Sequence, residues 1–371
     1  MKVSRLVPLF FGIACGTIQS KETQSQDTYK ANADTGASDD QNDTDASSLY
    51  EIPEYPAGVS TLAGSGEYTS IDGSGLGAAF SEPKAIRMTN DGTLIVADSG
   101  TGKIRTVELD GQVTSLQLEG PSPTAPSGLA IADDGTIYVS DYVEHCILKI
   151  VGNESSVFAG TCGTSGLQDG ASALFNLPRG IDLDADGNLI VADAHNFLIR
   201  RITPAGDTST IAGSGQEYAG PTEGPVDEAN LYIPFGVAVH QSGDIYISGF
   251  DHCIRRISDG QVSNVAGLCQ NYSNTGIDDG PAPNARFDTP LDIRFLDDDK
   301  LIIADSYNDR IRVFDVAQRN VDTIAGSDAG YLDGTTQDAL FDVPRSLAVD
   351  YAGNIYVADS VNMRIRVIAN E

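Results

Sequence analysis

The sequence has no tryptophan, few basic residues and no apolar run of membrane-spanning length. Lys and Arg total 23 against 53 Asp and Glu, so the formal net charge is −30. This charge repels nucleic acid and anionic membrane surfaces, and we expect no nucleic-acid partner. The missing tryptophan argues against a sugar-binding platform built on aromatic rings. The apolar run at residues 6–14 is far shorter than the ~20 residues that a spanning helix needs.

That short apolar run instead belongs to an export signal over residues 1–15. Lys2 and Arg5 form a basic start, and residues 6–14 form the apolar region of a signal peptide. Residues 12–16 resemble a bacterial lipobox, although Gly12 stands where leucine is usual. The resemblance implies lipidation of Cys15, with ordinary cleavage near Ala14 as the alternative. We therefore expect an exported protein of the cell envelope that touches a membrane only through a lipid anchor.

Residues 16–56 have the composition of an acidic tether. The segment is rich in Asp, Ser, Thr, Gln and Asn and has almost no large apolar residues. Such a segment cannot bury enough surface to offset the entropy of ordering it. We expect it to be disordered and to join the anchor to a folded body over residues 57–371.

The folded body is built from repeats. Runs such as 92–98, 135–141 and 187–193 end at equivalent positions 43 and 52 residues apart, which is close to the period of propeller blades. Each unit has four short β-rich runs, and in the third unit these are residues 180–183, 188–192, 198–202 and 208–212. Four antiparallel strands make one blade, and blades must stack around an axis to bury a core.

The two ends of the repeat region complement one another. The last unit supplies three strands, near residues 346–349, 354–358 and 364–368, and a lone strand at 59–63 precedes the first unit. A strand from the start of the region would complete the last blade and remove the free edges of the ring. The sequence predicts an all-β, six-bladed β-propeller closed by its N-terminal strand.

The repeat resembles a known family. Residues 357–366 read Val-Ala-Asp-Ser-Val-Asn-Met-Arg-Ile-Arg, 303–312 are a variant of this phrase, and 166–178 approach the loop phrase before it. These phrases are similar to the NHL repeat, and the similarity extends from about residue 59 to the C-terminus. NHL propellers serve mostly as platforms for protein, RNA or ligands, and a few relatives are enzymes, so the resemblance implies a fold more firmly than a function.

Four cysteines in the repeats predict two disulfides. Cys146 and Cys162 are 16 residues apart, as are Cys253 and Cys269, and both pairs hold the same repeat positions. Neighbouring strands of a hairpin bring such positions together, so we expect one bond in blade two and one in blade four. Free buried thiols are the alternative. A cysteine zinc site is disfavoured because the chain has no Cys-x-x-Cys spacing.

The sequence has few other residues that could bind a metal ion or catalyse a reaction. Propeller lyases that resemble this fold hold zinc with three histidines, but the four here, His145, His195, His240 and His252, fall at three repeat positions. Residues 182–193 superficially resemble a calcium loop, yet they form a hairpin without flanking helices. We predict no cofactor, while a divalent cation in the channel stays open. Five aspartates that end the second strand of a blade are expected to cap turns, with an axial carboxylate ring left open: Asp98, Asp141, Asp193, Asp305 and Asp359.

The long loops between blades carry a recurring acidic residue. Loops on one face of a propeller are the usual recognition surface, and their acidity suggests a basic partner. We expect a binding platform for a protein or small ligand. The alternatives are a metal-dependent hydrolase or lyase with its site in the central channel, and a structural part of an envelope assembly. The candidate binding-face residues are Asp72, Asp169, Glu223, Asp279 and Asp333.

Overall fold

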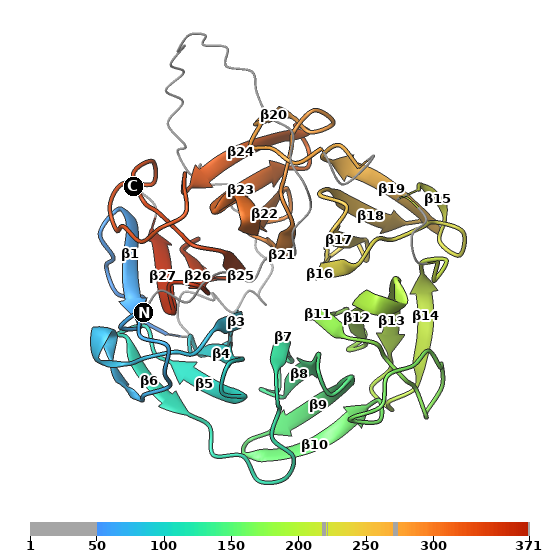
Figure 1. Cartoon of the computed structure of the whole chain (residues 1–371), viewed down its shortest axis with the longest axis horizontal. Helices are drawn as coiled ribbons and strands as arrows, with labels where there is room; N and C mark the ends of the chain where they lie inside the picture. Colours follow the sequence, from blue (N-terminus) through green and yellow to red (C-terminus); the bar gives the residue numbers. More distant parts are fainter. Residues whose placement is uncertain (1–49, 217–219, 221, 270–273, 370–371) are drawn as a thin grey trace, which may run out of the picture. The chain divides into compact units, whose positions relative to one another are not determined.

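The computed structural model describes residues 50–216, 220, 222–269 and 274–369, and these form six β-sheets. Each sheet is an antiparallel meander, with its first strand at the axis and its fourth at the rim (Figure 1). The strands follow runs rich in Val, Ile and Leu that alternate with tight turns. At Gly187, φ is +76°, a conformation that a side chain would strain. The predicted signal peptide with Cys15, and residues 16–49 of the predicted tether, lie outside the described residues.

The blades follow the chain in order. Blade one has β3 (Pro83–Met88), β4 (Leu94–Asp98), β5 (Lys103–Val107) and β6 (Gln112–Ser115), with β2 (Gly73–Ser74) added at its edge. Blade two has β7 (Pro126–Ile131), β8 (Ile137–Asp141), β9 (Cys146–Val151) and β10 (Glu154–Ala159). Blade three has β11 (Pro178–Leu183), β12 (Leu189–Asp193), β13 (Leu198–Ile202) and β14 (Thr208–Ala212).

The remaining blades repeat this plan. Blade four has β16 (Pro234–Val239), β17 (Ile245–Gly249), β18 (Ile254–Ser258) and β19 (Gln261–Ala266), with β15 (Gly224–Pro225) at its edge. Blade five has β21 (Pro290–Phe295), β22 (Lys300–Asp305), β23 (Arg310–Asp315) and β24 (Asn320–Ala325), with β20 (Gly280–Pro281). Blade six has β25 (Pro344–Val349), β26 (Ile355–Asp359) and β27 (Arg364–Ala369). The helical turns are η2 (Gly75–Gly77), η3 (Ala194–Asn196) and η4 (Ser306–Asn308).

The N-terminal strand closes the ring, as predicted. Strand β1 (Gly58–Ala63) pairs antiparallel with β27, with Val59 opposite Ile368, and becomes the fourth strand of blade six (Figure 1). The core lies between blades, since each of the six hydrophobic clusters combines residues of two neighbours. The cluster at the seam, for example, joins Val96 of blade one to Tyr356 of blade six. The contacts that close the ring between blades six and one are therefore of the same kind as those that pack the other blades together.

The boundary expected between tether and body is too late in the chain. Residues 50–56 were assigned to the tether, but Tyr50, Ile52 and Tyr55 pack against the cluster at the seam. The Tyr55 hydroxyl donates to the Leu109 carbonyl at 2.9 Å, and the Tyr351 hydroxyl donates to the Tyr50 carbonyl at 2.8 Å. Two tyrosines and an isoleucine supply enough apolar surface to order this short stretch. No helix in the described part of the chain has the length and apolarity that a membrane span requires.

Candidate functional site

The strand-end aspartates form buried clamps in four blades. In each clamp an arginine of the third strand binds the strand-end aspartate at 2.7–3.0 Å and a loop aspartate at 2.5–2.7 Å. The guanidinium also lies 5.1–5.2 Å from a phenylalanine ring centroid. The clamps are Asp98–Arg105–Asp72, Asp193–Arg200–Asp169, Asp305–Arg312–Asp279 and Asp359–Arg366–Asp333.

These aspartates also cap turns, as predicted. The Asn176 amide donates to Asp193 at 2.7 Å, and the Asp342 amide donates to Asp359 at 2.9 Å. In blade two the capping residue is Asp141, which accepts from Thr124 and Ala125, although Leu148 replaces the clamp arginine. In the five blades that have them, the carboxylates thus fasten the second strand to the loop that precedes the inner strand.

Four of the five acidic loop residues are structural members of the same clamps. Asp169 accepts from Arg200 and from the Thr210 amide, and Asp333 accepts from Arg366 and from the Thr61 amide. Glu223 accepts from the Asn264 amide at 2.6 Å. Their negative charge is therefore largely compensated by groups of the same chain. A role on a binding face stays a prediction for Asp72, Asp169, Glu223, Asp279 and Asp333.

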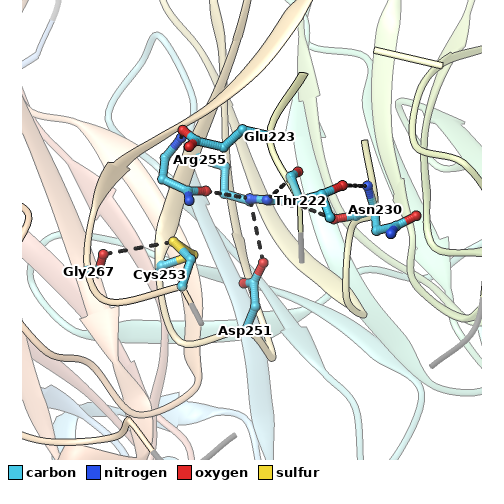
Figure 2. The surroundings of a disulfide bond; sticks show 9 residues. Thr222, Glu223, Asn230, Asp251, Cys253, Arg255 and Gly267 are labelled. Atoms are coloured by element: carbon cyan, nitrogen blue, oxygen red, sulfur yellow. Dashed lines mark hydrogen bonds and ion pairs between the residues drawn. A yellow bond between two sulfur atoms is a disulfide. The ribbon is translucent and has the colours of Figure 1, made fainter. Parts of the chain in front are cut away.

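Both disulfides are present with the predicted pairing. Cys146 bonds Cys162, and Cys253 bonds Cys269. Figure 2 shows the second bond beside Arg255, which here reaches Asp251 because Gly249 replaces the strand-end aspartate. The disulfides stand in the two blades whose clamp is incomplete.

Two of the histidines join neighbouring blades. The Nδ1 atoms of His145 and His252 each accept at 3.0 Å from a backbone amide, of Leu177 and Thr289 respectively. Burial lowers the pKa of His252, with Asp288 opposing that shift. His240 bonds Ser242 and the Asp298 carbonyl, whereas His195 is exposed in η3. Among the described residues, no three side chains of His, Cys, Asp or Glu gather as a metal site.

The centre of the ring carries a different set of residues. Each inner strand begins with proline, and the next residue borders a small axial cavity of about 30 Å³. We call these six residues the axial mouth. They are Lys84, Ser127, Arg179, Phe235, Leu291 and Arg345.

Three of the six residues are cations with little compensation. Among the described residues, only Lys84 has a carboxylate partner, Glu82 at 3.2 Å. In the described part of the chain, Arg179 and Arg345 form no side-chain ion pair, and the buried Nε of Arg179 has no hydrogen-bond partner. Tyr142 lies between two of the cations, with its ring centroid 4.9 Å from Lys84 and 4.5 Å from Arg179.

Burial and mutual repulsion shift these cations toward neutrality. Burial, followed by the charge of Arg345, lowers the pKa of Lys84 to about 8. The same two causes lower the pKa of Arg179 to about 10. An anion placed among the three side chains would favour their charged forms and so raise both lowered pKa values.

Below the axial mouth, the charges are balanced. Arg87 binds Asp292 at 3.0 and 3.3 Å, and Arg294 binds Asp182 at 2.9 Å. Burial raises the pKa of Asp182 to about 6. Asp182 began the suspected calcium loop, yet it faces arginine here, and Asp184 accepts from the amides of Asp186 and Asn188 within the hairpin turn. The excess positive charge is therefore confined to the axial mouth.

Reasoning from the sequence missed the axial mouth. Its cations are single residues, successively 95 and 166 positions apart, in a chain of net charge −30. A usable signal was present, because each follows the proline that opens an inner strand. Aligning the six units at that proline would have placed them in one ring.

Comparisons with known proteins agree with the repeat and the fold. The NHL repeat model matches residues 175–202 and 341–368. The chain is 27% identical to the chloroplastic SUPPRESSOR OF QUENCHING 1 protein of Arabidopsis thaliana over 56% of its own length, and 27% identical to bovine NHL repeat-containing protein 2 over 74%. It spans 26% and 44% of those two relatives.

A solved structure shares the architecture. An auxiliary nutrient binding protein from Bacteroides thetaiotaomicron superposes with a TM-score of 0.66 at 16% identity, covering 83% of this chain and 75% of that one. This likeness concerns the fold. The chain therefore contains NHL repeats, matched in its third and sixth units, and folds as a six-bladed β-propeller.

Proposed function

We propose that this protein is an exported, lipid-anchored binding propeller whose axial mouth receives an anionic group. The observation that carries the proposal is the convergence of Lys84, Arg179 and Arg345, of which only Lys84 has a carboxylate partner within the described ranges of the chain. The export signal and Cys15 support placement at the cell envelope. The shared fold of a nutrient binding protein is in keeping with a ligand-binding role.

The electrostatics favour a small anion at this position. Buried cations attract more strongly than exposed ones, because little water screens them. Arginine also presents a planar fork that matches carboxylate, phosphate and sulfate groups. The cavity is small, so it suits one such group, while the body of the ligand lies outside over the surrounding loops.

The charges at the axis disfavour the hydrolase or lyase alternative. A catalytic divalent cation needs several free side-chain ligands and an open position for water. The carboxylates below the axial mouth, Asp182 and Asp292, are already bound by arginines. Three cations also line the same cavity as Asp292, so the site is better suited to anions.

Isothermal titration of the purified protein with acetate, phosphate and sulfate tests this proposal. We expect at least one anion to bind, and Arg179→Met or Arg345→Met to weaken that binding about tenfold or more, since charged hydrogen bonds contribute ~1.5–3 kcal/mol each. Arg256→Met removes the same charge from a third strand, where Arg256 faces Asp244 at 3.8 Å, and should leave binding unchanged. Equal losses in all three variants, or no binding of any anion, would overturn the proposal.

The anchor has a separate test. Labelled palmitate should enter the protein in bacterial cells, and Cys15→Ser should abolish the labelling. Labelling that persists in the variant, or is missing from the parent protein, would contradict lipidation at Cys15.

A further inference from the structure

Blade four departs from the repeat at positions that surround the axial mouth. Two residues before the inner-strand proline it has Tyr232, where the other blades have Ser81, Thr124, Asn176, Asp288 and Asp342. Directly after the second strand it has Phe250, where four blades have serine or alanine and blade two has Tyr142. With Phe235 in the axial mouth, blade four places an aromatic ring at each of three positions.

These rings form one connected arc. The centroid of Phe235 lies 6.1 Å from that of Phe250, which lies 6.1 Å from that of Tyr232. Tyr232 in turn stacks on Phe197 of blade three at 6.3 Å. We call Phe235, Phe250, Tyr232 and Phe197 the aromatic arc. It runs from the axis outward over blades three and four.

The inner end of the aromatic arc meets the cations. The guanidinium of Arg179 lies 5.3 Å from the centroid of Phe235 and 4.5 Å from that of Tyr142. Phe235, Phe250 and Tyr232 are only partly buried, so their apolar surfaces stay accessible beside the positive charge. A partly exposed apolar surface next to a charged pocket is typical of a site for a ligand with an anionic end and an apolar body.

We propose that the ligand of the axial mouth is an organic anion with an aromatic ring, which lies on the aromatic arc while its acidic group contacts Lys84, Arg179 and Arg345. This inference rests on the proposed function and narrows the ligand class. Stacked or edge-on contacts with Phe235 and Phe250 would bind the ring, and aromatic pairs prefer such offset geometries. A bare inorganic anion would use only the cations.

A purely structural role for the arc is the competing explanation. Gly249 replaces the strand-end aspartate of blade four, and the rings could merely fill the space that this change leaves. In that case the arc would support the blade without favouring one anion over another. The affinity ratio between two anions separates the explanations, because a structural role does not change it.

Titration with phenylacetate and acetate measures that ratio. Both anions carry one carboxylate, so the difference reports the ring. We expect phenylacetate to bind the parent protein at least tenfold more tightly, as follows from burying most of a phenyl ring. Phe235→Ser and Phe250→Ser adopt the residues of blades two and five and should bring the ratio toward one, because acetate has no ring for the aromatic arc to bind.

Tyr351→Ser removes an exposed ring from the turn after β25, at the opposite end of an inner strand, and should preserve the ratio. Equal affinities for both anions in the parent protein would overturn this inference and leave the proposed function intact. Failure of both anions to bind would overturn the two together. The parent measurement needs no variant, so the inference stays testable even where a substitution prevents folding.

Discussion

Lys84→Met should stabilise the fold while weakening the site. The Lys84 side chain is only 7% exposed, and its pKa is lowered from 10.5 to about 8, chiefly by burial. A shift of this size corresponds to about 3 kcal/mol against the charged form. Methionine keeps the apolar stem and removes the charge, but it also loses the ion pair with Glu82. We therefore expect a gain of about 1–3 kcal/mol in the free energy of unfolding at pH 7.

The gain should depend on pH in a defined direction. Between pH 8 and 10.5 the folded protein holds fewer protons on Lys84 than the unfolded chain, so the stability of the parent protein rises with pH there. The cost of the buried charge is fully present below pH 8 and disappears toward pH 10.5. Urea unfolding of both proteins at pH 7 and pH 10 measures this difference. A variant that is less stable at pH 7, or a gap that does not shrink at pH 10, would refute the reasoning.

Four further outcomes follow from the same structure. Acetate affinity in calorimetry should fall as pH rises through about 8, where Lys84 loses its proton, and should be flat in Lys84→Met; a flat parent profile would contradict this. Arg366→Met leaves buried Asp359 without its cation and should cost about 3–5 kcal/mol in urea unfolding, whereas Asp141→Asn, which leaves no clamp arginine behind, should cost less. Reduction of the disulfides should lower stability by about 3 kcal/mol per bond, and peptide mapping that finds other pairings would be inconsistent with the structure. Deleting residues 58–63 removes β1 and should abolish cooperative thermal melting, while a melt like that of the parent would argue against ring closure.

The architecture could be predicted because its determinants are local and repeated. Runs such as 189–193, rich in branched apolar residues and ending in Asp, recur in five of the six units, and tight turns with glycine separate the strands. The disulfides were predictable for a related reason, since two identical spacings occupy equivalent strands. Closure by β1 followed from counting the strands in the last unit.

The candidate site consists of residues that differ from one repeat to the next. A search for recurring patterns does not detect such residues. Arg179 and Arg345 look like ordinary surface charges until the inner strands bring them to one axis. The acidic loops predict a binding face, but the sequence does not show that Asp169 faces the buried Arg200. The tether boundary was misplaced because Tyr50 and Tyr55 stand in a polar segment, and their partners Tyr351 and Tyr356 are some 300 residues away.

The central claim is that an anion binds among Lys84, Arg179 and Arg345. Crystals of the protein soaked with selenate offer the most direct test, because anomalous scattering locates selenium without reference to the structure. We expect one dominant peak at the axial mouth, within hydrogen-bonding distance of at least two of the three cations, and its loss in Arg345→Met. Peaks only at outer cations such as Arg256, or none at the axis, would contradict it.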